Sequence, residues 1–134
     1  MIGLFLVTHG TLGESLVQGL CHVLHERPPQ VAQLGLAAGD DPDTLLPLAR
    51  QMLGWVDSGR GVLLLTDLYG ATPSNLASRL IEPGRVELVA GVSLPMLLKL
   101  VHHRERDLAT LVQRALAGAS ESAVHVASAP GHGN

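Results

Sequence analysis

The feature of this sequence that most constrains its fold is a fourfold alternation between short apolar runs and segments with helical spacing of apolar residues. The apolar runs cover residues 1–8, 31–37, 62–66 and 86–90, and a helical pattern follows each of them. A run such as Ile2-Gly-Leu-Phe-Leu-Val7 lacks polar alternation, as expected for a strand buried on both faces of a parallel sheet. The alternation predicts an α/β fold: one doubly wound, mostly parallel sheet with helices on both faces.

Proline, glycine and capping residues bound the expected helices. Asp41 and Ser93 each precede a proline near a helix start, and Thr72 before Pro73 has the pattern of an N-cap followed by the first helical residue. The pattern predicts helices over about 14–26, 42–58 and 73–81, a further helix from 94 that carries Val101, and a last helical stretch over 108–116.

The length of 134 residues suits a single domain that can bury a core without a metal or disulfide. We assign residues 1–127 to that domain, with Ala123 to Ala127 as a possible extra C-terminal edge strand. Residues 128–134 have the composition of a flexible tail. There is no internal repeat and no long linker.

Composition argues against two classes of partner. The formal charge of -3, with one Phe, one Trp and one Tyr for base stacking, argues against nucleic acid. The longest apolar runs fall far short of the roughly 18 residues that a membrane span needs, so membrane insertion is not expected. The single Cys21 cannot form an internal disulfide and no signal peptide is recognisable, which predicts a cytoplasmic protein.

Two polar residues directly follow apolar runs, and the expected topology brings them together. His9 follows the first run and Asp67 follows the third. A sheet of order 2-1-3-4 places those two strands side by side at the switch point, where ligands of such sheets bind. A carboxylate that binds one ring nitrogen of a histidine leaves the other free as a nucleophile. The pair therefore predicts a histidine able to attack an electrophile such as a phosphoryl group.

Neighbouring residues suit a phosphoryl group. Gly10 and Gly70 allow close backbone approach, and the helix after Thr72-Pro73 directs free N–H groups toward the strand ends. We predict that the backbone of these glycines and the hydroxyls of Thr72 and Ser74 bind the phosphoryl oxygens, with His9 and Asp67 as the catalytic pair. Cationic side chains are scarce in these segments, so backbone amides are expected to supply most of the charge stabilisation.

Three segments together resemble the mannose-family EIIA domain of the bacterial phosphoenolpyruvate-dependent sugar phosphotransferase system. They are Leu6-Val-Thr-His-Gly10, Thr66-Asp-Leu-Tyr-Gly-Ala-Thr-Pro-Ser-Asn75 and Val89-Ala-Gly-Val-Ser-Leu-Pro-Met-Leu-Leu98, and the resemblance covers about Met1 to Leu116.

The resemblance implies roles for individual residues and partners. His9 would be phosphorylated by the carrier protein HPr, with Asp67 as its paired carboxylate, and Thr72 lies where the family commonly has a serine near the phosphoryl group. The acceptor would be an EIIB-type protein, in sugar uptake or its regulation, and no metal or nucleotide cofactor is implied. The family also implies a homodimer that exchanges a C-terminal strand, for which Ala123 to Ala127 is the candidate.

Other interpretations of the same residues are kept as alternatives. An EIIA-like domain that serves dihydroxyacetone kinase uses an equivalent histidine, and a non-catalytic regulatory binding module would make His9 dispensable. Asp67 could merely cap a turn. His9 and Asp67 could be metal ligands, as in small tetrapyrrole chelatases, but the spacing supplies no converging third ligand. Phosphoglycerate-mutase-like enzymes place an arginine before their phosphohistidine, where this chain has Thr8.

Overall fold

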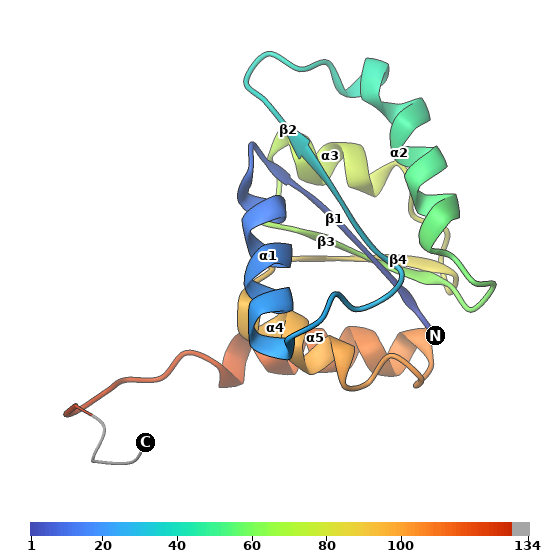
Figure 1. The fold of residues 1–134 in the computed structure, drawn as a ribbon. Coiled ribbons are helices and arrows are strands. Elements are labelled where there is room, and N and C mark those ends of the chain that lie inside the picture. The colour runs from blue at the N-terminus through green and yellow to red at the C-terminus, as the bar shows by residue number, and fades with distance from the viewer. Residues whose placement is uncertain (130–134) are drawn as a thin grey trace.

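The computed structural model describes residues 1–129, which fold around a four-stranded, wholly parallel sheet (Figure 1). The strands are β1 (Gly3–His9), β2 (Val31–Leu36), β3 (Val62–Thr66) and β4 (Val86–Ala90), and their order is β2-β1-β3-β4. This confirms the predicted α/β fold and the 2-1-3-4 order. The carboxyl ends of β1 and β3 are therefore adjacent.

Over the residues that the structure describes, five helices cover the two faces of the sheet. Helices α1, α4 and α5 pack on one face, and α2 and α3 pack on the other (Figure 1). Their bounds are α1 (Leu12–Leu24), α2 (Pro42–Val56), α3 (Thr72–Ser78), α4 (Leu94–Val101) and α5 (Leu108–Glu121). In the described part of the chain, no helix is both long and apolar enough to cross a bilayer.

The core consists of two apolar clusters separated by the sheet, because alternate side chains of each strand point to opposite faces. Leu4, Leu6 and Leu63 belong to the cluster under α1, α4 and α5, whereas Phe5 and Leu64 belong to the cluster under α2 and α3. All five side chains are fully buried. The unbroken apolar runs of the two central strands thus reflect burial on both faces.

Two of the three predicted N-caps are confirmed. The Asp41 carboxylate accepts a hydrogen bond from the Asp43 amide, and the Ser93 hydroxyl accepts one from the Met96 amide. The prediction for Thr72 was wrong, because Ala71 has the extended backbone of a cap and Thr72 is already helical. The Thr72 hydroxyl is therefore not used as a cap.

Helix α3 also ends earlier than predicted, at Ser78. The amides of Arg79 and Leu80 bond to carbonyls three residues back, at Leu76 and Ala77. This tightening of the last turn ends the α-helical pattern before residue 81.

The possible extra C-terminal edge strand does not form in the single chain. Residues 123–127 have no regular structure, and the segment leaves the body of the domain beyond α5 (Figure 1). With no neighbouring strand to bond to, Val124 and Val126 remain 74% and 68% exposed. Most of the predicted flexible tail, residues 130–134, lies outside the described residues.

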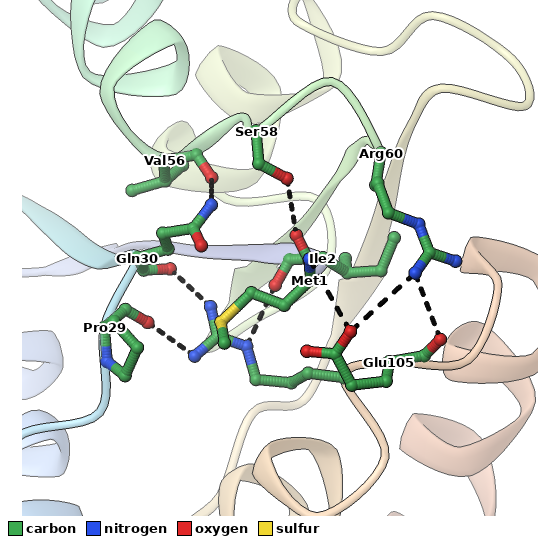
Figure 2. Close-up of polar contacts among 9 residues, drawn as sticks. Met1, Ile2, Pro29, Gln30, Val56, Ser58, Arg60 and Glu105 are labelled. Atoms are coloured by element: carbon green, nitrogen blue, oxygen red, sulfur yellow. Dashed lines mark hydrogen bonds and ion pairs between the residues drawn. The ribbon is translucent and has the colours of Figure 1, made fainter.

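A buried arginine forms hydrogen bonds at the edge of the sheet where the strands begin. The guanidinium of Arg104 donates hydrogen bonds to the carbonyl oxygens of Ile2, Pro29 and Gln30, which Figure 2 shows meeting from separate segments. Burial lowers the pKa of Arg104 to about 10, so the group is still charged at neutral pH. Arg104 thus joins the α4–α5 connection to the starts of β1 and β2, at the edge opposite the carboxyl ends of the strands.

Candidate functional site

His9 and Asp67 form a hydrogen-bonded pair at the carboxyl edge of the sheet. His9 is the last residue of β1, and Asp67 directly follows β3. One carboxylate oxygen, Oδ2, lies 2.8 Å from the ring Nδ1 of His9 and also accepts the His9 backbone N–H at 3.2 Å. The proximity predicted for the two residues is therefore present in the structure.

The electrostatics of the pair fix where the ring proton lies. Burial would raise the pKa of Asp67, but the hydrogen bonds from the His9 side chain and backbone and the charge of His9 outweigh it, so the pKa lies below its ordinary value. The carboxylate is ionised at neutral pH and can only accept hydrogen bonds. The nitrogen that faces it, Nδ1, therefore carries the proton of a neutral ring.

This arrangement leaves Nε2 of His9 as the unprotonated nitrogen with a free lone pair. The side chain of His9 is 50% exposed, whereas that of Asp67 is 12% exposed. An approaching molecule can thus reach the ring, while the carboxylate stays behind it. The pair has the orienting logic of a histidine–carboxylate couple that prepares a nucleophile.

A hollow of about 350 Å³ lies beside the ring, and we call it the His9 hollow. It is lined by His9 and Gly10 at the end of β1, by the last residue of β2 and the four residues after it (36–40), and by Thr72 and Pro73 at the start of α3. The first amides of α3 have no acceptor within the helix, so this end favours an anion. The structure thus brings Gly10 and Thr72 to His9, as the sequence predicts.

The other two predicted phosphoryl-binding residues lie elsewhere. Gly70 and Ser74 line a second hollow of about 430 Å³, between α3 and β4, which we call the Ser74 hollow. Gly70 has a φ of +83°, a conformation that glycine adopts readily in the turn between β3 and α3. The geometry therefore gives no support to a phosphoryl contact by Gly70 or by the Ser74 hydroxyl.

Sequence reasoning missed the loop between β2 and α2. Ala37, Ala38, Gly39 and Asp40 form one wall of the His9 hollow. The Asp40 carboxylate accepts the Ala37 amide at 2.7 Å, so it shapes its own loop. The topology could have indicated this loop. β2 lies beside β1 and runs parallel to it, so the loop after β2 begins at the same edge of the sheet as His9.

An anion in the His9 hollow would be stabilised by backbone N–H groups, because cationic side chains are missing from its described lining. None of the described residues that line it is Lys or Arg. Within residues 1–129, no group of three or more His, Cys, Asp or Glu side chains could hold a metal ion. The chemical resources of the site are therefore one oriented imidazole, its carboxylate, the Thr72 hydroxyl, backbone amides and the Asp40 carboxylate, which accepts the Ala37 amide.

Comparison with known proteins adds an independent line of information. The family model described as "PTS system fructose IIA component" (EIIA-man) matches residues 3–116. The chain is 32% identical over 107 residues to the mannose-specific EIIAB component of the phosphotransferase system of Escherichia coli, covering 79% of this chain and 33% of that protein. It is 31% identical over 106 residues to the fructose-specific EIIA component of Bacillus subtilis, covering 78% of this chain and 72% of that protein.

Solved structures agree on the fold. The mannose/sorbose-specific IIA subunit of Enterococcus faecalis superposes with a TM-score of 0.83 at 19% identity, covering 96% of this chain and 97% of that one. A phosphotransferase EIIA component from Streptococcus agalactiae gives a TM-score of 0.82 at 23% identity, covering 93% and 97%. This chain spans only about a third of the Escherichia coli relative, which leaves the activity of that whole protein outside the comparison.

Proposed function

Because the chain belongs to the mannose-family EIIA components of the sugar phosphotransferase system, we propose that it is a phosphocarrier that accepts a phosphoryl group on His9. The donor in this proposal is the phosphohistidine of HPr, and the acceptor is an EIIB-type protein. The observation that carries the proposal is the hydrogen-bonded pair of Asp67 and the Nδ1 of His9, which leaves Nε2 free.

The proposed transfer is an in-line displacement at phosphorus. The lone pair of His9 Nε2 forms a P–N bond while the P–N bond to the donor histidine breaks, and the donor nitrogen keeps that electron pair. As positive charge develops on the His9 ring, the proton stays on Nδ1, which continues to donate its hydrogen bond to the Asp67 carboxylate. Backbone amides at the start of α3 and the exposed Thr72 hydroxyl would bind the phosphoryl oxygens in the His9 hollow.

Catalysis in this proposal comes from position rather than from a strong driving force. Donor and product are both phosphohistidines, so the exchange is close to isoenergetic and requires neither a nucleotide nor a metal. Holding the nucleophile and the anion-binding amides in place before the partner arrives supplies the rate. A cytoplasmic location is part of the proposal, since a carrier of this kind must meet its protein donor and acceptor.

A relay assay tests the proposed partners. Incubation with phosphoenolpyruvate, enzyme I and HPr should add one acid-labile phosphoryl group to the protein, as measured by intact mass. Subsequent addition of an EIIB-type protein should remove that group. Failure to accept from HPr contradicts the proposal, and transfer to a dihydroxyacetone kinase subunit instead of EIIB redirects it to the alternative acceptor.

The proposal includes a homodimer in which the C-terminal segments are exchanged. β4 is an edge strand, with the Ser74 hollow beside Leu88 on one face of the sheet. On the other face, Glu87 and Val112 line a further hollow of about 450 Å³ between β4 and α5. A strand added at this edge would direct alternate side chains to the two faces. Residues 123–127 supply such a strand, and burial of their exposed valines against a second copy would stabilise the pair.

The exchange makes a prediction for the C-terminal valines. The double substitution Val124→Asp/Val126→Asp should convert a dimer into a monomer in light scattering coupled to gel filtration, because the added strand would have to bury two carboxylates. Ser128→Asp, which adds a carboxylate just beyond the segment, is the matched control and should remain dimeric. A wild-type protein that is monomeric at micromolar concentration, or a double variant that stays dimeric, contradicts the exchange.

A further inference from the structure

The turn that follows His9 is held from two sides by residues that take no part in the chemistry. We propose that Gly35 of β2 and Thr8 of β1 are positioning residues, which set the orientation of His9 by fixing residues 9–13 between β2 and the start of α1. This inference rests on the proposed phosphocarrier function for its activity measurements, but its structural measurement does not.

On one side, the turn lies directly on the end of β2. The Gly10 amide donates to the Leu36 carbonyl at 2.8 Å. The Gly10 carbonyl oxygen lies so close to Gly35 that a Cβ built on Gly35 would be 1.9 Å from it. Real Cβ atoms do not approach backbone oxygens this closely, so any side chain at residue 35 must displace the turn. Gly35 does not have a positive φ, and its role is therefore close approach rather than backbone freedom.

On the other side, the Thr8 side chain closes the turn against α1. Thr8 is fully buried, and its hydroxyl oxygen accepts the Gly13 amide at 2.8 Å. The N-cap residue of α1, Thr11, makes no side-chain capping bond. Thr8 therefore satisfies a helix-start amide that the cap leaves free, and it does so from the residue immediately before His9.

These contacts bear on His9 because its neighbours in the chain make them. Thr8 and Gly10 flank His9 in the chain. One Asp67 oxygen accepts hydrogen bonds from both the backbone N–H and the ring Nδ1 of His9. A rotation of either flanking peptide changes the direction of that amide and moves the ring relative to the carboxylate. Misplacement of a reacting group by about 1 Å can lower a rate by a hundredfold.

The Gly35→Ala variant tests the contact with β2. We expect phosphoryl acceptance from HPr to slow by at least about tenfold, because the added methyl displaces the Gly10 carbonyl next to the nucleophile. Gly54→Ala in α2 is the matched control, since a Cβ there meets nothing within 4 Å, and its rate should equal that of wild type. A Gly35→Ala protein that is folded by circular dichroism and accepts phosphoryl at the wild-type rate overturns the role of Gly35.

The Thr8→Val and Thr8→Ser pair tests the contact with α1. Valine keeps the shape but removes the acceptor for Gly13, so acceptance should slow by at least about fivefold, whereas serine restores the acceptor and should recover most of the rate. This pair also keeps the inference testable if Gly35→Ala fails to fold. Equal rates for valine and serine overturn the role of the Thr8 hydroxyl.

Ring ¹⁵N chemical shifts of His9 in the unphosphorylated protein separate this inference from the proposed function. Wild type should show one dominant tautomer, with the proton on Nδ1, and the Gly35→Ala and Thr8→Val proteins should show shifts averaged toward those of a free imidazole. Unchanged His9 shifts in both variants overturn the positioning role whatever the protein transfers. Changed shifts in the two variants, together with a wild-type protein that accepts no phosphoryl group from HPr, leave the positioning role standing and count against the phosphocarrier function alone.

Discussion

Replacement of His9 by alanine is expected to abolish phosphoryl acceptance, with a loss of about a thousandfold or more. The reason is that Nε2 of His9 is the nucleophile in the proposed transfer, and none of the described residues that line the His9 hollow is a second histidine. The measurement is the intact mass of the protein after incubation with phosphoenolpyruvate, enzyme I and HPr, under conditions that preserve phosphohistidine.

A histidine elsewhere provides the control for this experiment. His22 is exposed on α1, and His22→Ala should accept a phosphoryl group at the wild-type rate. An acid-labile gain of mass that persists in the His9→Ala protein would assign the chemistry to another residue and remove the basis of the proposed function.

The second large effect is expected for Asp67→Asn, which should slow phosphoryl acceptance by about a hundredfold or more while leaving the fold intact. An asparagine side chain is neutral, and it can present an N–H group to the ring. It therefore no longer requires the ring proton to lie on Nδ1, and it does not stabilise the positive charge that develops on the ring during transfer. Single-turnover rates with phosphorylated HPr would measure this effect.

The acid dependence of stability checks that Asp67→Asn removes the intended interaction. Since hydrogen bonds from His9 hold the pKa of Asp67 below 3.8, its contribution to folding is present above that ordinary pKa and is lost as the pH falls through the lower folded value. The asparagine variant should lack this part of the acid dependence in thermal unfolding. Asp43→Asn, on the exposed first turn of α2, is the control and should keep it. An unchanged transfer rate in Asp67→Asn would exclude the carboxylate from the mechanism.

The strand order and the pairing of His9 with Asp67 could be predicted because both follow from general packing rules applied to patterns that are visible in the sequence. Unbroken apolar runs mark strands buried on both faces, and right-handed crossovers limit their order. The carboxyl ends of neighbouring strands then meet at one edge, which is where His9 and Asp67 stand.

The details that escaped prediction depend on contacts that the sequence does not display. The N-cap of α3 is Ala71, one residue before the predicted Thr72. The backbone path of the β3–α3 turn determines this position. The contact of Gly35 with Gly10 arises from a strand register that places Thr8 beside Gly35, and local patterns do not encode that register. Residues 123–127 have a strand-like composition, but a strand requires a neighbour, and in the described chain these residues pair with no strand.

Assignment of the phosphorylated atom tests the central claim most directly. In a ¹⁵N-histidine-labelled sample phosphorylated through HPr, the phosphorus–nitrogen coupling identifies which ring nitrogen carries the phosphoryl group. We expect it on Nε2 of His9, with a proton retained on the Nδ1 that faces Asp67. A phosphoryl group on Nδ1 of His9, or on any other residue, would contradict the account.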